Sequence, residues 1–138
     1  VHIRVDPLIS VSEGHRIGDE VMDALKTRFP EVGDVVVHID PEDDIVGDVY
    51  SKLPMRSVIV AEINTNLHKL QNNFDARFSL QPKNIVVHYL DDGCQIEIWM
   101  TMPDEATTRD CSLASSTIKD ALMRIDNIVS ASVLFSSN

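Results

Sequence analysis

The first forty residues combine two strand patterns with one helical pattern. Apolar side chains at every second position of residues 1–5 predict a strand with one buried face. Ser10 and Glu13 then have the spacing of a helix N-terminal cap, and the apolar periodicity that follows predicts a helix ending at Phe29-Pro30. Alternation returns over residues 35–40. This β-α-β order predicts parallel strands, because such crossovers join parallel strands in nearly every protein.

A second series of patterns follows residue 54. Apolar positions from Val58 to Leu70 predict a helix, and two strands at 85–90 and 95–102 are joined by Asp92-Gly93, a strong hairpin signal. A further helix carries Cys111 on its apolar side, and a last strand covers residues 129–135. Cys94 lies beside the turn, where we expect it to be exposed. Trp99 falls on the outward face of its strand, which suggests a protein interface.

The element order indicates a duplicated fold. The second half reads α-β-β-α-β and the first half β-α-β, and both helices preceding the last strands carry Asp-Ala-Leu, at 23–25 and 120–122. We therefore predict an α+β protein of two ferredoxin-like units. The first covers residues 1–44 and is truncated at its N-terminus, residues 45–54 are a linker, and residues 55–138 form the second unit. Because Val1 lies inside a strand, we expect the chain to be a fragment.

Composition narrows the classes of function. The chain has 138 residues with 22 acidic and 12 basic side chains, and 43% of its residues are hydrophobic, which is typical of a globular protein. Residues 1–44 alone hold 11 acidic and 4 basic residues. This balance argues against nucleic acid as a partner, because phosphate binding needs clustered Lys and Arg. No apolar run reaches the roughly 18 to 20 residues of a spanning helix, and no signal peptide is visible.

Three histidines of the first unit are candidate metal ligands. His2 and His38 alternate with apolar neighbours on their strands, so both face away from the core, and His38 shares its face with Asp40. His15 lies outside the apolar stripe of its helix. The ends of two parallel strands and the start of their helix could bring the four side chains to one edge. Three imidazoles and a carboxylate suit Zn²⁺ and are tolerable for iron, manganese or cobalt. Unrelated surface histidines remain the alternative.

Four segments of residues 1–44 resemble one known family. They are Val1-His-Ile-Arg-Val-Asp-Pro, Glu13-Gly-His-Arg-Ile-Gly-Asp-Glu, Leu25-Lys-Thr-Arg-Phe-Pro and Val37-His-Ile-Asp-Pro-Glu-Asp. In order and spacing they are similar to the C-terminal cytoplasmic domain of cation diffusion facilitator transporters. The resemblance is looser over residues 53–138, which are similar to an extension found in some members.

The resemblance implies a metallochaperone-like fold that dimerises beneath a membrane portion and binds divalent metal at the dimer interface. Position by position, it assigns the metal ligands His2, His15, His38 and Asp40. The metal is expected to be Zn²⁺, with Fe²⁺, Mn²⁺, Co²⁺ or Cd²⁺ as alternatives.

The function expected from this resemblance is regulatory and not enzymatic. The chain would be a metal-sensing, dimerising cytoplasmic domain of an integral membrane efflux transporter, with a second copy, the transmembrane portion and divalent cations as partners. Acidic residues near the ligands would make metal-free copies repel: Asp6, Asp40, Glu42, Asp43 and Asp44. The sequence shows no Gly-rich loop or nucleophile motif. Two alternatives stay open: a regulatory module that binds a small organic effector, and a soluble metallochaperone.

Overall fold

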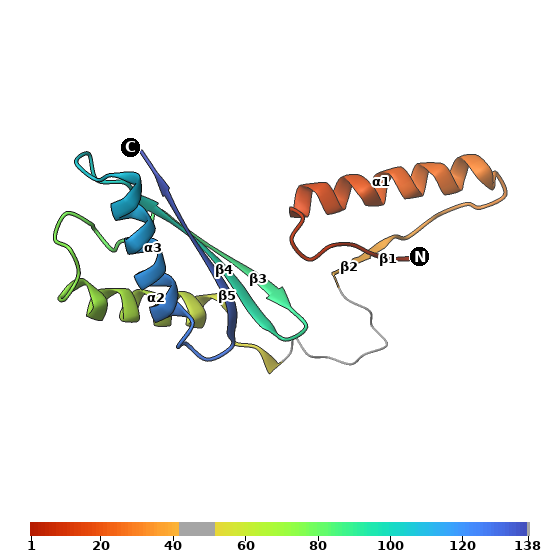
Figure 1. Cartoon of the computed structure of the whole chain (residues 1–138). Coiled ribbons are helices and arrows are strands. Elements are labelled where there is room, and N and C mark those ends of the chain that lie inside the picture. The colour runs from red at the N-terminus through yellow and green to blue at the C-terminus, as the bar shows by residue number, and fades with distance from the viewer. Residues whose placement is uncertain (42–51, 138) are drawn as a thin grey trace. The chain divides into compact units, whose positions relative to one another are not determined.

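The computed structural model describes residues 1–41 and 52–137, which contain three helices and five strands in two sheets. The predicted α+β class is confirmed. The contacts divide the chain into unit 1, within Val1–Val49, and unit 2, within Tyr50–Asn138 (Figure 1). The predicted boundaries at residues 44 and 45 lie outside the described residues. In the described ranges, no helix is both long and apolar enough to cross a membrane.

Unit 1 consists of β1 (His2–Arg4), α1 (Val11–Arg28) and β2 (His38–Asp40). The two strands are parallel, as predicted, with His2 opposite His38, Ile3 opposite Ile39 and Arg4 opposite Asp40. Both strands are shorter than the alternating patterns that predicted them. A strand extends only where a neighbour offers hydrogen bonds, so the three residues of β1 limit β2 to three as well.

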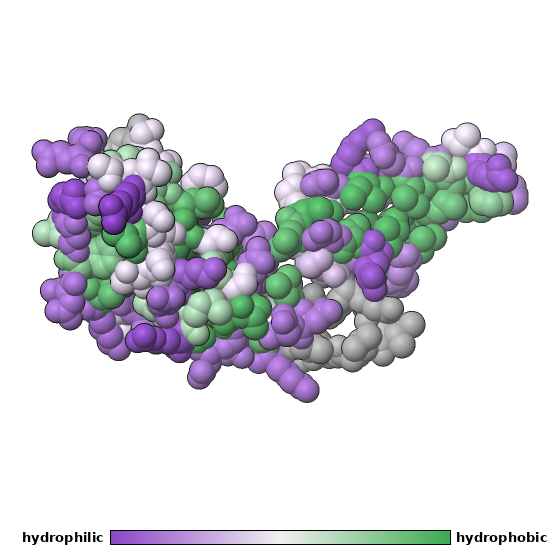
Figure 2. Space-filling view, viewed as in Figure 1, coloured by the Kyte–Doolittle hydropathy of each residue, from purple (hydrophilic) through white to green (hydrophobic). Residues whose placement is uncertain are grey.

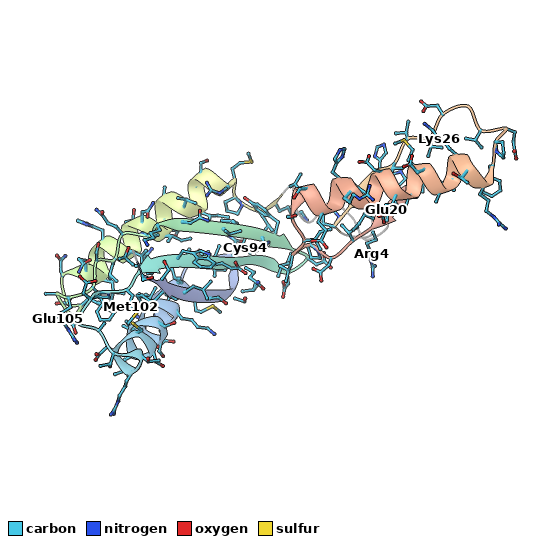
Figure 3. The ribbon with its side chains drawn as sticks, turned by 90° about the horizontal axis from the view of Figure 1, so that it is seen from above. Arg4, Glu20, Lys26, Cys94, Met102 and Glu105 are labelled. Atoms are coloured by element: carbon cyan, nitrogen blue, oxygen red, sulfur yellow. The ribbon has the colours of Figure 1, made fainter. Side chains whose placement is uncertain are left out.

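Helix α1 has the predicted ends and lies along the strand pair. The Ser10 hydroxyl accepts a hydrogen bond from the Glu13 amide at 3.1 Å, and Phe29 is the C-terminal cap that follows the last helical residue. Gly14 and Gly18 face β2, where a Cβ on either would stand 3.5 Å from the Ile39 side chain. The charged Glu20 lies on the exposed side of α1 (Figure 3). The helix therefore covers the Ile39 face of the sheet.

Unit 1 has almost no core of its own. Gly14 is the one buried residue among residues 1–41. Large apolar side chains remain exposed in unit 1: Val1, Leu8, Val11, Phe29, Val32 and Val36. Figure 2 shows hydrophobic surface along this unit. With 41 described residues and no buried hydrophobic side chain, unit 1 is near the size below which domains usually need further stabilisation. We therefore expect unit 1 to depend on contacts beyond its own described residues.

Unit 2 has the predicted α-β-β-α-β order. Its elements are α2 (Arg56–Gln71), β3 (Asn84–Leu90), β4 (Gly93–Thr101), α3 (Thr108–Leu122) and β5 (Ile128–Ser136). The sheet order is β3-β4-β5, with β3 antiparallel and β5 parallel to β4. The predicted hairpin is confirmed, although its two turn residues are Asp91 and Asp92, because Gly93 already pairs with Leu90.

The core of unit 2 lies between one face of this sheet and the two helices (Figure 1). Alternate residues of β4 point into it, and Ile96, Ile98 and Met100 have no exposed surface. Helix α2 contributes Ile59, Ile63 and Leu67, and α3 contributes Ile118 and Leu122. The other face of the sheet carries Trp99, which is 40% exposed as its position in the alternation predicts. Unit 2 is thus a two-layer domain whose two helices pack on one face of its sheet.

Candidate metal centre in unit 1

The parallel pairing of β1 and β2 brings two of the candidate histidines together. His2 and His38 are directly opposite each other in the register, and Asp40 follows two residues after His38 on the same face. The intervening Ile3 and Ile39 point to the face that α1 covers. Sequence alternation therefore placed His2, His38 and Asp40 correctly on the outward face of the strand pair.

The contacts within this group are close. Nδ1 of His2 lies 2.8 Å from Oδ2 of Asp40, and the two imidazole rings have their centroids 4.8 Å apart at an interplanar angle of 32°. The His2 side chain is 62% exposed and the Asp40 side chain 21%. The carboxylate fixes the orientation of the His2 ring, as carboxylates do for metal-binding imidazoles in general. We call His2, His38 and Asp40 the histidine cluster.

His15 lies apart from the histidine cluster. It belongs to α1, which packs on the opposite face of the strand pair, and its side chain is 80% exposed. Its neighbour is Asp19, with Nε2 to Oδ2 at 3.6 Å. Among residues 1–41 and 52–137, no group of three or more His, Cys, Asp or Glu side chains is arranged to hold a metal ion. The four predicted ligands thus do not converge within one chain, and their role as ligands stays a prediction.

Two further features surround the candidate residues. Arg4 lies opposite Asp40 in the register and adds a positive charge to the face of the histidine cluster. Near His15, a groove at the start of α1 is lined mainly by apolar residues, among them Val5, Ile9 and Val11. The alternation of residues 1–5 contained the signal for Arg4. The groove is formed partly by the loop between β1 and α1, which has no periodicity from which it could be predicted.

The expected acidic surroundings are described only in part. Asp6 closes a turn, because its Oδ1 accepts a hydrogen bond from the Leu8 amide at 2.8 Å. Glu42, Asp43 and Asp44 lie outside the described residues. Of the five acidic residues expected near the ligands, Asp40 is therefore the one that the structure shows in contact with the histidine cluster.

Unit 2 offers no comparable group within residues 52–137. His88 is half-buried, and its Nε2 lies 3.9 Å from Oε1 of Glu97. Cys94 is fully buried, so the expectation that it is exposed was wrong. It points to the core face of β4, and burial raises the pKa of its thiol, which disfavours the thiolate that binds metals. Cys111 is partly buried against Phe78, as expected of a packing residue.

Comparisons with known proteins agree with the resemblance seen in unit 1. Residues 1–42 match the family model described as "Cation efflux protein, cytoplasmic domain". The whole chain is 29% identical to Metal tolerance protein C1 of Arabidopsis thaliana, over 144 aligned residues. It spans 31% of the length of that relative. No solved structure matches the chain.

The family match covers both strands and the helix of unit 1, and with them the histidine cluster and His15. The similarity to the Arabidopsis protein continues through unit 2. Both comparisons therefore support the resemblance of the chain to the C-terminal cytoplasmic domain of cation diffusion facilitators.

Proposed function

We propose that the chain is the metal-sensing and dimerising regulatory part of a divalent cation efflux transporter, located on the cytoplasmic side of a membrane and joined to a transmembrane portion. The observation that carries the proposal is the histidine cluster, which lies inside the residues that match the family. Two imidazoles and a carboxylate on an exposed face are a ligand set suited to Zn²⁺. Fe²⁺, Mn²⁺, Co²⁺ and Cd²⁺ are the alternative ions.

The separation of His15 from the histidine cluster favours a site shared by two copies. The strand pair stands between them in one chain, and rotating a side chain cannot cross a sheet. In a homodimer, His15 from a second copy can approach the outward face of β1 and β2. A metal ion would then gain a ligand from each copy, and binding would be coupled to association.

Charge supplies the mechanism of sensing. With 11 acidic and 4 basic residues in positions 1–44, two copies of this segment repel each other when no metal is bound. A divalent cation between the copies offsets this repulsion and adds bonds that exist only in the closed arrangement. Because the cation binds the closed arrangement more tightly, it shifts the population toward it. The proposed activity is therefore a change in association and not catalysis.

Zinc titration of the purified 138-residue chain tests this proposal. We expect Zn²⁺ to raise Tm and to promote dimers in sedimentation, because a ligand bound only by the folded, paired state stabilises it by mass action. Replacing His2 and His38 together by Ala should abolish both effects. His68→Ala is the matched control, since His68 is exposed on α2 in unit 2 and should leave them unchanged. The effects should also weaken in acid, where protons compete for imidazole nitrogen.

Mixing two defective variants tests the sharing of the site. The His15→Ala variant keeps the histidine cluster, and the His2→Ala/His38→Ala variant keeps His15. Each should show no zinc-dependent gain in dimerisation when alone. A 1:1 mixture should recover zinc-dependent dimers, because each heterodimer contains one complete site. No recovery in the mixture, or a zinc-induced Tm shift that survives loss of His2 and His38, would contradict the assignment.

A further inference from the structure

Strand β5 forms one edge of the unit 2 sheet and lacks the usual protection of an edge. Its nine residues, Ile128–Ser136, contain no charged side chain and no proline, although the chain as a whole carries a net charge of −10. Exposed edge strands are normally blocked by such residues, because their unpaired backbone groups attract other strands. At the opposite edge a charged side chain covers one backbone group: the Arg56 guanidinium donates to the Ile85 carbonyl of β3 at 2.8 Å.

The direction of the backbone groups of β5 follows from one hydrogen bond. The Met102 amide donates to the Ser136 carbonyl at 2.9 Å, so Ser136 turns its backbone toward β4. Because backbone directions alternate along a strand, Ser132 and Leu134 also turn toward β4, while Ala131 and Val133 turn away from it. The Val133 carbonyl accepts a hydrogen bond from the Ser115 hydroxyl of α3 at 3.2 Å, which agrees with an outward direction. That carbonyl has a second lone pair for another donor.

The outward edge has a sequence that reads the same in both directions. Residues 129–133 are Val-Ser-Ala-Ser-Val, symmetric about Ala131. In an antiparallel pair of two such strands related by a two-fold axis at Ala131, Ala131 faces its own copy and Ser130 faces Ser132 of the other chain. Identical and complementary side chains then meet at each position, which is the requirement of a two-fold interface. Opposed Ser residues in a sheet can also hydrogen-bond to each other.

From these observations we propose that β5 pairs antiparallel with β5 of a second copy, centred on Ala131, and joins two unit 2 sheets into one six-stranded sheet. The occupant is a second copy because the edge is self-complementary in sequence and uncharged in an otherwise acidic chain. The interface lies outside the segment that matches the family and needs no metal. It rests on the proposed function only in that dimerisation through unit 1 raises the local concentration of the two β5 strands.

Charge exchange on Ser130 and Ser132 tests the pairing. A Ser130→Lys/Ser132→Lys chain and a Ser130→Glu/Ser132→Glu chain should each raise the dimer dissociation constant at least tenfold in EDTA, because like charges meet across the axis. A 1:1 mixture should restore dimers as heterodimers. Thr101→Lys and Thr101→Glu are the matched controls, since Thr101 lies on the central strand β4 opposite Ser136, away from residues 129–133, and should leave dimerisation unchanged.

Amide hydrogen exchange on the wild-type chain locates the contact. The amides of Ala131 and Val133 should slow at least tenfold as the concentration rises through the dimer range, while that of Ser132, already directed to β4, should not change. A chain without zinc whose Ala131 and Val133 amides exchange equally fast at all concentrations would overturn the proposal, as would charged variants that dimerise like wild type. Charged variants that lose their dimers in EDTA but regain them with zinc would support this proposal and keep it distinct from the unit 1 proposal.

Discussion

Gly93 shows how a single residue determines where the unit 2 sheet turns. Its φ is +151°, and a Cβ at this position would stand 2.6 Å from Cγ1 of Val129 and 2.7 Å from the carbonyl oxygen of Asn127. The neighbouring Cys94 amide donates to that same carbonyl at 2.7 Å, so the two segments are held close together. Any side chain at residue 93 would therefore both strain the backbone and separate β4 from the start of β5.

We predict that Gly93→Ala lowers the free energy of unfolding by about 2 to 4 kcal/mol, from backbone strain together with overpacking. Urea unfolding measures this change. Gly33→Ala is the control, because a Cβ there meets no atom within 4 Å. It should change stability by less than about 1 kcal/mol. A Gly93→Ala chain as stable as the control would show that the turn relaxes without cost.

Between elements, one arginine ties a loop to the start of a helix. The Arg77 guanidinium donates to both carboxylate oxygens of Asp75 and lies 3.5 Å from Oδ1 of Asp110 in the first turn of α3. Asp110 also caps the helix by accepting from the Thr107 amide at 2.9 Å. Hydrogen bonds from Arg77 lower the pKa of Asp75, and those from Thr107 are the main cause of the lowered pKa of Asp110.

We predict that Arg77→Met lowers Tm slightly at neutral pH and that the loss fades in acid. A carboxyl whose pKa is depressed in the folded state adds stability above its unfolded pKa and loses it as the pH falls through the folded value. Arg109→Met removes the same charge from an exposed position of α3 and is the control. Melting curves of both variants from neutral to acid pH check the prediction. A constant difference in Tm across that range would rule out the ionic origin.

Long periodic elements could be predicted from the sequence, and irregular ones could not. The ends of α1 followed from Ser10 and Phe29-Pro30, and the exposure of Trp99 from strict alternation on β4. Cys94 was misjudged because its place beside a turn was weighed above its parity with Ile96. The Asp75–Arg77–Asp110 contacts depend on a loop that has no repeating pattern, so only the folded chain reveals them.

The candidate site was predictable to the same extent. Alternation fixes the faces of residues on a strand, so the outward group of His2, His38 and Asp40 could be deduced. The position of His15 could not, because it depends on which face of the strand pair α1 covers. That choice is made by the packing of Gly14 and Gly18 against Ile39, a tertiary contact without a sequence period.

At the scale of the whole chain, the two units differ in how many hydrophobic residues they bury and in how much negative charge they carry. All the buried hydrophobic residues among residues 1–41 and 52–137 belong to unit 2. Unit 1 has the exposed histidine cluster and belongs to the more acidic segment of the chain. The main core and the proposed metal ligands thus belong to different units, and we do not expect that core to require metal in order to form.

We predict that zinc changes the arrangement of two copies more than it changes their fold. Far-ultraviolet circular dichroism should change little on zinc addition, because the buried core, two of the three described helices and three of the five described strands belong to unit 2. Small-angle scattering should show more compact dimers, because the cation offsets repulsion between the unit 1 segments. A large gain in helix or strand signal with unchanged dimer dimensions would mean that the metal folds the domain, as it does in zinc fingers.

The parallel pairing of β5 also sets the order in which unit 2 can fold. The β3–β4 hairpin closes over two turn residues, whereas β5 must find β4 across a separation of 35 residues, as between Ser130 and Gln95. Contacts distant in sequence form more slowly, so we expect the hairpin first and β5 last. Until then an uncharged, β-branched segment is exposed to other unfolded chains. The β5 segment is therefore open to aggregation during synthesis and refolding.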